Sequence, residues 1–232
     1  MIRIPEIIAH RGAPREALEN TLAAFQIALD QGADGIELDV HTTNDGAVVV
    51  HHDAAIRVDR NGAITLAPIA NLMASEALAL PLAGGVTLPA LDDVLELIGT
   101  RAVAYVEVKA AGVTGPLLDC LDRHPRSHVA VHAFDHRIPM AVRAKRPTLS
   151  VGLLSASYPL SLVGFIGAAR PQALWQQAHL IDAVLVHAAH ALGTRVIVWT
   201  ENDDVHAREL IAMGVDALCT DIPGVLRAAL AR

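Results

Sequence analysis

Residues 32–53, GADGIELDVHTTNDGAVVVHHD, contain the pattern that decides the fold of this chain. The run IELDV is typical of a buried strand, yet it carries two carboxylates, Glu37 and Asp39. Because side chains alternate along a strand, both carboxylates point to one face and the apolar residues point to the other. Two ionised carboxylates on an inner face repel each other and lose hydration, so they stay charged only beside a cation or hydrogen-bond donors.

The short connection after this strand predicts a hairpin. HTTNDG is too short to cross over to a parallel strand, so the run AVVV is predicted to return antiparallel to IELDV, with Asp45-Gly46 in the turn. This hairpin would bring His51 and His52 beside Asp39. The spacing leaves open which of the two imidazoles faces the carboxylates.

The chain on either side of this hairpin alternates between strand and helix patterns. We predict strands at residues 6–10, 34–40, 101–109, 128–134, 148–154, near 172–175, 194–200 and 216–221. We predict helices at 91–99, 114–123, 137–145, 180–193, 203–213 and 222–231, and one more that is capped by Asn20 or Thr21 and stops near Gly32. Such alternation implies a parallel sheet, and the chain length favours a single-domain (β/α)₈ barrel over residues 1–232. Residues 54–89 do not fit the alternation and are predicted to form an insertion above the barrel, after its second strand.

Composition excludes several classes of function. The chain has 232 residues, 53% of them hydrophobic, and a net charge of −7 without a basic tract, which argues against a nucleic-acid partner. Cys120 and Cys219 form no metal-binding or redox pattern, and we expect reduced core thiols in a cytoplasmic protein. The start, MIRIPEIIAHRG, has no long apolar core with a cleavage site, so no signal peptide is expected.

One uncharged segment, residues 147–169, is long enough to span a membrane if it were helical. Pro159 lies in its middle, with serines and glycines around it, so we predict a strand, a loop and a short apolar turn or helix instead of a transmembrane segment. Core packing is the simplest role for it, and an apolar lip beside a pocket is the alternative.

Polar residues recur where predicted strands end, which is where (β/α)₈ barrels carry their active sites. Glu37, Asp39 and Glu107 are three hard oxygen ligands, a set that suits one Mg²⁺ or Ca²⁺ ion. The alternative is a buried ion-pair network with Arg11 and Lys109, but such a network gains little from two imidazoles beside it. The other polar or aromatic residues at strand ends are His10, Trp199, Thr220 and Asp221.

In six motifs, taken in order, the chain resembles the glycerophosphodiester phosphodiesterases: HRGAPREALENT, IELDVHTTNDGAVVVHHD, TLPALDDVL, YVEVK, VIVWTEND and LCTDIP. The resemblance implies a (β/α)₈ barrel that hydrolyses glycerophosphodiesters to glycerol 3-phosphate and an alcohol. It implies that His10 and His52 are the catalytic histidines, which resolves the choice between the two adjacent imidazoles. It also implies that Arg11 and Lys109 contact the phosphate and that Glu37, Asp39 and Glu107 hold the divalent cation.

The family's chemistry implies that the glycerol 2-hydroxyl of the substrate attacks the phosphorus first, and that water then opens a cyclic phosphate. Such a neighbouring hydroxyl has a very high effective concentration. Histidines titrate near working pH, which suits them to both proton transfers. Within this scheme we assign His10 as the base and His52 as the acid. Trp199 is expected to line the pocket against the glycerol carbons, with core packing as its alternative role.

Three departures from the family pattern leave the alcohol part of the substrate open. Leu18 replaces the usual proline of Pro-Glu-Asn-Thr, the run after HD reads AAIRVDRNG, and Ala133-Phe134 replaces a common Ser-Phe pair. His132 lies near a strand end and could line the pocket. The remaining histidines are expected at the surface or in ordinary packing: His41, His124, His128, His136, His179, His187, His190 and His206.

Two other functions remain open at this point. A barrel of this kind could act on lysophospholipids, with the apolar stretch at 155–169 facing the lipid. Alternatively, it could bind phosphodiesters without cleaving them, although the chain has lost none of the expected ligands or histidines.

Overall fold

The computed structural model of the protein describes residues 5–60 and 63–232. Residues 1–4 belong to the start on which the expectation of no signal peptide rests, and they lie outside the described residues. Residues 61–62 of the run AAIRVDRNG lie outside them as well.

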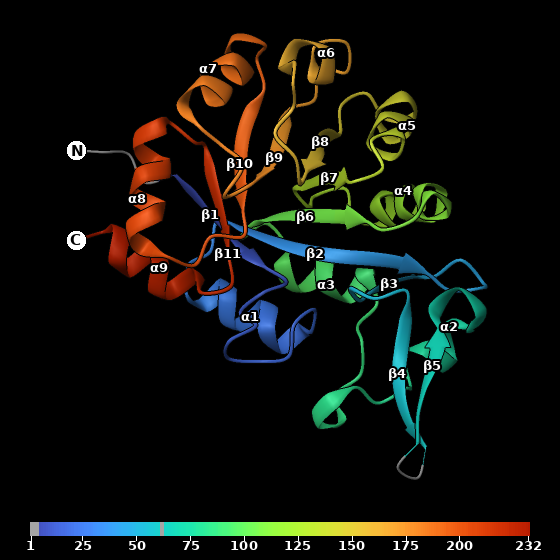
Figure 1. The fold of residues 1–232 in the computed structure, drawn as a ribbon. Helices are drawn as coiled ribbons and strands as arrows, with labels where there is room; N and C mark the ends of the chain where they lie inside the picture. The colour runs from blue at the N-terminus through green and yellow to red at the C-terminus, as the bar shows by residue number, and fades with distance from the viewer. Residues whose placement is uncertain (1–4, 61–62) are drawn as a thin grey trace.

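Within the described ranges, eight parallel strands close into a barrel with helices around it (Figure 1). The strand order is β1-β2-β6-β7-β8-β9-β10-β11, and β11 pairs with β1 to close the ring. This arrangement confirms the predicted (β/α)₈ barrel, including the short strand near 172–175, which is β9. The strands are β1 (Glu6–His10), β2 (Gly35–Thr42), β6 (Val103–Val108), β7 (Val129–Ala133), β8 (Ser150–Ser155), β9 (Ala173–Gln177), β10 (Arg195–Trp199) and β11 (Ala217–Thr220).

Helices follow the barrel strands and bury their apolar faces against the outside of the sheet. Side-chain caps fix several of their starts. The Thr21 hydroxyl accepts from the backbone N–H of Ala24 and begins α1, and the Asp182 carboxylate accepts from Leu185 N–H and begins α7. The helices are α1 (Leu22–Asp30), α3 (Leu91–Ile98), α4 (Thr114–Arg123), α5 (Arg137–Lys145), α6 (Leu162–Ile166), α7 (Ala183–Ala191), α8 (Asp204–Met213) and α9 (Pro223–Leu230), with the 3₁₀ turn η3 (Ala111–Val113) before α4.

The strand β3 (Val48–Val50) returns antiparallel to β2, as the short connection predicts. Val40 pairs with Val50, and the backbone N–H of His51 donates to the carbonyl of Asp39 at 3.0 Å. Gly46 has a φ of +84°, the left-handed conformation that an Asp-Gly turn provides. The hairpin therefore carries the two histidines back to the carboxylates of β2.

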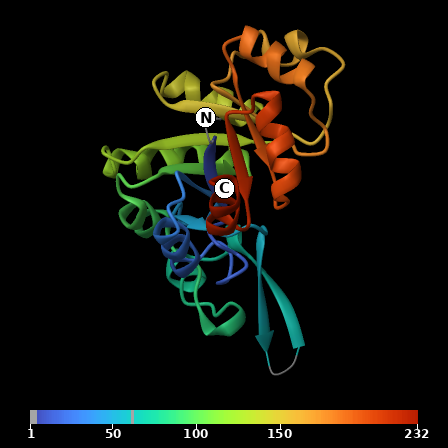
Figure 2. The same cartoon turned by 90° about the vertical axis from the view of Figure 1, so that its left-hand side faces the viewer.

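The segment after β3 forms a small two-stranded sheet that projects from the barrel in both views (Figures 1 and 2). One face of this sheet packs on its own apolar cluster, which includes Ile56 and Val58. Because side chains alternate, Arg57 and Asp59 lie on the opposite face. The elements of this segment are β4 (Ala55–Arg60), β5 (Ala63–Pro68), η1 (Ile69–Asn71), α2 (Ala74–Ala77) and η2 (Ala83–Gly85).

Two other expectations from the sequence are confirmed. Residues 147–169 form the strand β8, a loop and the short helix α6, and no helix in the described part of the chain is long and apolar enough to cross a membrane. Cys120 and Cys219 are both buried free thiols.

Candidate active site

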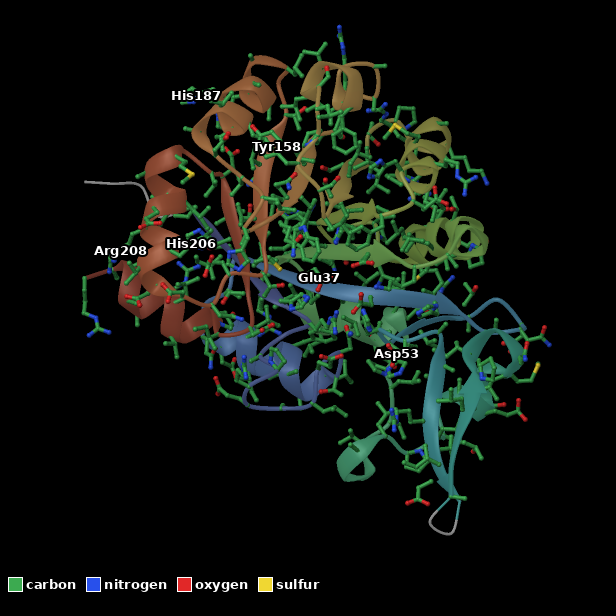
Figure 3. The ribbon with its side chains drawn as sticks, viewed as in Figure 1. Glu37, Asp53, Tyr158, His187, His206 and Arg208 are labelled. Atoms are coloured by element: carbon green, nitrogen blue, oxygen red, sulfur yellow. The ribbon has the colours of Figure 1, made fainter. Side chains whose placement is uncertain are left out.

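Most of the predicted site residues meet at the carboxyl ends of the adjacent strands β1, β2 and β6, where Figure 3 shows Glu37 near the middle of the barrel. His52 joins them from the end of β3, and Trp199 lies apart from them on β10. Strand register explains the proximity of the residues on the barrel strands. His10 on β1 is the partner of Glu37 on β2, and Asp39 on β2 is the partner of Glu107 on β6. Glu107 is in turn the partner of His132 on β7. Side chains from segments more than 120 residues apart therefore form one buried acidic cluster.

Asp39 and Glu37 have different electrostatic surroundings although both are buried. Asp39 lies 3.2 Å from Lys109 Nζ and 3.2 Å from Arg11 Nε, and it accepts a hydrogen bond from Asn20 Nδ2 at 2.8 Å. Burial opposes its ionisation, but Lys109 and Arg11 outweigh burial and hold the pKa of Asp39 below its ordinary value. Burial and the charge of Asp39 instead raise the pKa of Glu37 to about 8.

Three side chains are placed so that they could share a metal ion. Glu37, Glu107 and His132 each offer a ligand atom, and these atoms lie within 4.8 Å of one another. The pKa of His132 is lowered to about 4, mainly by burial, so its imidazole is neutral, as a metal ligand must be. Two carboxylates and an imidazole fit a divalent cation. Burial, and after it the charge of Asp39, raises the pKa of Glu37, and a cation would offset both effects.

This arrangement adds His132 to the residues that the sequence singled out as ligands. Its ring stacks on that of Trp175, with 4.1 Å between the centroids, which fixes its orientation. Asp39 remains beside Glu107 in the strand register but is engaged by Arg11 and Lys109. The ligand set Glu37, Asp39 and Glu107 therefore stays a prediction.

Each of the two predicted catalytic histidines has a carboxylate on its Nδ1 atom. His10 Nδ1 lies 2.7 Å from Asp221 Oδ1, and His52 Nδ1 lies 2.9 Å from Asp53 Oδ1. The His10 pair is the more buried, with 20% of each side chain exposed, compared with 37% for His52 and 65% for Asp53. Burial lowers the pKa of His10, but the hydrogen bond to Asp221 and the charge of Glu37 outweigh it and raise the pKa above its ordinary value.

Several supporting residues were missed by sequence reasoning. Asn202 donates from Nδ2 to Asp221 Oδ2 and accepts from the Asp221 N–H, both at 2.8 Å, so it fixes the carboxylate that holds His10. Glu19 accepts from Arg11 Nη1 at 2.9 Å, and Asn20 bridges to Asp39. The motif Leu-Glu-Asn-Thr could have indicated the last two roles, whereas nothing local marks Asn202.

Gly12 allows the chain to turn immediately after the first two site residues. Its φ is +89°, and a Cβ there would lie 2.7 Å from the backbone of Ala24. A side chain would therefore collide with α1, so only glycine lets α1 pack this close to the end of β1.

The structure shows features of both roles considered for Trp199, core packing and lining of the pocket. Its indole N–H donates to the carbonyl of Trp175 at 3.1 Å, as in core packing. Its ring also meets the edge of Phe134, with 5.5 Å between the centroids, and the Phe134 side chain is 47% exposed. The two rings therefore form an aromatic wall that remains accessible from the mouth of the barrel.

Both adjacent histidines are half-buried, and each has a different neighbourhood. The positive charge of His52 helps to lower the pKa of Asp39, so His52 lies close to the carboxylate cluster. His51 lines a cavity of about 660 Å³ between the barrel and the inserted segment, together with Asp53 and Glu19.

A second group of metal-ligating side chains lies between α3 and α4, on the outside of the barrel. Asp92, Cys120 and His124 place their ligand atoms within 4.8 Å of one another. The Asp92 carboxylate accepts two bonds from the guanidinium of Arg123 and one from His124 Nε2. This network is satisfied internally, and it joins the two helices.

Comparison with known proteins agrees with this geometry. Residues 10–225 match the model of the glycerophosphoryl diester phosphodiesterase family. The chain is 32% identical over 235 residues to a glycerophosphodiester phosphodiesterase of Caldanaerobacter subterraneus subsp. tengcongensis, with 95% of each chain covered.

Solved structures give the same result at the level of the fold. A crystal structure of a glycerophosphodiester phosphodiesterase from Agrobacterium tumefaciens matches with a TM-score of 0.82 and 25% identity, covering 97% of this chain and 100% of that one. An Oleispira antarctica phosphodiesterase in complex with the product sn-glycerol-3-phosphate shares the fold with a TM-score of 0.88 and 24% identity, covering 99% and 98%. The chain belongs to the glycerophosphoryl diester phosphodiesterase family and is a phosphodiester hydrolase.

Proposed function

We propose that this enzyme hydrolyses glycerophosphodiesters to glycerol 3-phosphate and an alcohol, using one divalent cation and the two histidines His10 and His52. The observation that carries the proposal is the pair of imidazoles beside one buried carboxylate cluster, each with Nδ1 on a carboxylate. Nδ1–H then donates to the carboxylate, which leaves Nε2 of each ring to exchange protons with the substrate.

The charged residues of the site divide into cation ligands and phosphate contacts. Glu37, Asp39 and Glu107 would hold Mg²⁺ or Ca²⁺, with His132 beside Glu37 and Glu107 as a further ligand. The cation would supply positive charge to the phosphoryl oxygens when it is bound. Arg11 and Lys109 each have N–H donors beyond those used on carboxylates, and these donors are suited to the phosphate oxygens.

Proton transfer is assigned to the two histidines. His10 Nε2 accepts the proton of the glycerol 2-hydroxyl, which attacks the phosphorus and forms a cyclic phosphate. His52 donates a proton to the departing alcohol oxygen. In the second step a water molecule opens the cyclic phosphate, with the proton transfers reversed. The raised pKa of His10 favours the opposite assignment, and the dependence of each variant on the leaving group distinguishes the two.

An assay of metal-depleted enzyme against several glycerophosphodiesters tests this proposal. Glycerophosphocholine, glycerophosphoethanolamine and glycerophosphoglycerol would be supplied with no ion, and then with Mg²⁺, Ca²⁺ or Mn²⁺ restored. We expect glycerol 3-phosphate to form only after an ion is restored. Full activity in the presence of a chelator would contradict the requirement for a divalent cation. Absence of glycerol 3-phosphate with every ion would contradict the proposed substrate class.

The exposed apolar side chains of residues 155–169 favour one second candidate, hydrolysis of lysophospholipids. Tyr158, Leu160 and Val163 are 45%, 108% and 65% exposed in and after the loop that follows β8. Comparing turnover of glycerophosphocholine with that of lysophosphatidylcholine distinguishes the two substrates.

Replacing Trp199 by Ala is expected to raise KM by about 10-fold and to lower kcat much less. The aromatic wall offers the glycerol carbons an apolar contact that is equal in the ground state and the transition state, and loss of such uniform binding appears in KM. Trp199→Phe is the matched control, since it keeps an apolar ring and removes only the hydrogen bond to Trp175. A fall in Tm without a change in KM would assign Trp199 to core packing.

Replacing Asp221 by Asn is expected to lower kcat by about 10²-fold, the low end of what a positioned base supplies. The amide keeps the shape of the carboxylate but can present N–H to His10 Nδ1, which favours the wrong tautomer. The measurement is kcat together with Tm. A lower Tm with unchanged kcat would show that Asp221 has only a structural role at the end of β11.

A further inference from the structure

A cavity opens between the barrel and the inserted segment, directly beside the catalytic residues. Its volume is about 660 Å³, within the range of about 300–1,000 Å³ that is typical of sites for drug-sized ligands. Its walls come from the loop after β1, the end of β3, the sheet β4–β5 and the turn around η2. The small sheet that projects in Figures 1 and 2 therefore forms one side of a binding space.

The inner end of this cavity is built from the neighbours of the phosphate-binding and acid residues. Asp53, which lines the cavity, accepts from His52, and Glu19, which also lines it, holds Arg11. Figure 3 shows Asp53 where the chain passes from the barrel to the inserted segment. If a phosphodiester binds at Arg11, the cavity therefore lies next to the phosphate on the side where His52 stands. His52 is the residue assigned to protonate the leaving alcohol.

The walls beyond this inner end are largely apolar. Leu18, from the loop after β1, and Ile64, from β5, both line the cavity and are 37% and 62% exposed, so each has apolar surface that a ligand could cover. Leu82 and Pro81 close a third side from the turn around η2. Arg57 and Asp59 add charged groups from β4, but Glu19 and Asp53 are engaged by the catalytic residues themselves.

This wall includes positions where the chain departs from the family pattern. Leu18 stands in place of a proline, and Asp59 belongs to the run AAIRVDRNG that follows HD. Two of the three departures that left the alcohol open therefore contribute to one cavity, whereas Phe134, from the third, packs against Trp199.

We propose that this cavity is the subsite for the leaving alcohol, and that it selects glycerophosphodiesters whose alcohol carries an apolar substituent. This proposal rests on the proposed function, since it names the alcohol of the same reaction. Two-carbon amino alcohols would leave most of the volume filled with water. A hydrocarbon chain would cover Leu18, Ile64 and Leu82, and the release of water from these surfaces would stabilise the complex and the transition state alike.

A series of n-alkyl esters of sn-glycerol 3-phosphate tests the subsite. The ethyl, butyl and hexyl esters have alcohols of similar acidity, so the chemical step is matched and differences in kcat/KM report binding of the chain. We expect kcat/KM to rise about threefold for each added methylene, somewhat below the gain for full burial because the cavity is open. The hexyl ester should therefore exceed the ethyl ester by about 10²-fold.

Variants on the two walls locate the effect. Ile64→Asn and Leu18→Asn should each reduce the hexyl-to-ethyl ratio by about 10-fold, because they place an amide against the chain. Leu160→Asn is the matched control, since Leu160 is fully exposed in the loop after β8 and does not line the cavity. It should keep the full ratio. Tm of each variant checks that the fold is retained.

The outcomes separate failure of the subsite from failure of the proposed function. If no ester yields glycerol 3-phosphate with any restored cation, the proposed function fails. If the ethyl ester is hydrolysed but kcat/KM does not rise with the length of the alkyl chain, only the proposal of an apolar subsite fails. Loss of the ratio in Leu160→Asn, or its survival in both cavity variants, would overturn the placement of the chain in this cavity.

Discussion

The variant Glu37→Gln should lose activity by about 10³-fold or more while remaining folded. Such a loss corresponds to the several kcal/mol of charge stabilisation that a bound metal ion contributes. In the absence of metal, the variant should melt at the same temperature as the wild type or above it, because burial and the charge of Asp39 already raise the pKa of Glu37 and the neutral amide removes that repulsion. The measurements are kcat/KM with saturating Mg²⁺ or Ca²⁺ and Tm with a chelator.

A matched substitution on the surface controls for the change of charge. Glu209→Gln alters an exposed glutamate of α8 and should leave both measurements near the wild-type values. Glu107→Gln should reproduce the loss of activity, since Glu107 lies in the same group of ligand atoms. If the Glu37 variant kept its activity, or lost it only together with its stability, Glu37 would be a structural carboxylate and not a ligand.

His132→Gln extends this comparison to the residue that the structure adds. A ligand contributes to cation affinity, so the variant should need about 10- to 100-fold more metal for half-maximal activity. A residue that only packs on Trp175 would change Tm without changing the metal requirement.

The barrel could be predicted from sequence because its signals are local. Each strand is a short apolar run followed by a helix start, and HTTNDG fixes the hairpin of β2 and β3 by its length alone. The two carboxylates on β2 could be placed on one face by the alternation of side chains.

The contacts that orient the site could not be predicted in this way, because they join distant parts of the chain. Asp221 holds His10 across 211 positions of sequence, and no spacing rule relates the two. His132 becomes a neighbour of Glu37 only through the order of the strands in the closed barrel. The sheet β4–β5 escaped prediction because β5 is exposed along almost its whole length, with the apolar residues Ile64 and Leu66 facing solvent, so its hydrophobic pattern does not mark a buried face.

The two histidines should be distinguished by how their loss depends on the leaving group. A general acid protonates the departing alkoxide, which matters most for a poor leaving group, whereas p-nitrophenolate leaves as a stable anion. His52→Ala should therefore lose about 10²-fold more rate on an n-alkyl ester of glycerol 3-phosphate than on its p-nitrophenyl ester. His10→Ala should slow both esters to a similar extent, because the 2-hydroxyl must lose its proton in either case.

The aryl substrate must retain the glycerol 2-hydroxyl, since without it the nucleophile changes and the comparison no longer reports on the leaving group. His187→Ala, an exposed histidine of α7 in Figure 3, is the control and should match the wild type on both esters. Selective rescue of His10→Ala by the aryl ester would exchange the two roles, as the raised pKa of His10 would also favour. If neither variant distinguished the esters, the acid–base model would be wrong, and the proton transfers would have to be assigned to water or to other groups of the site.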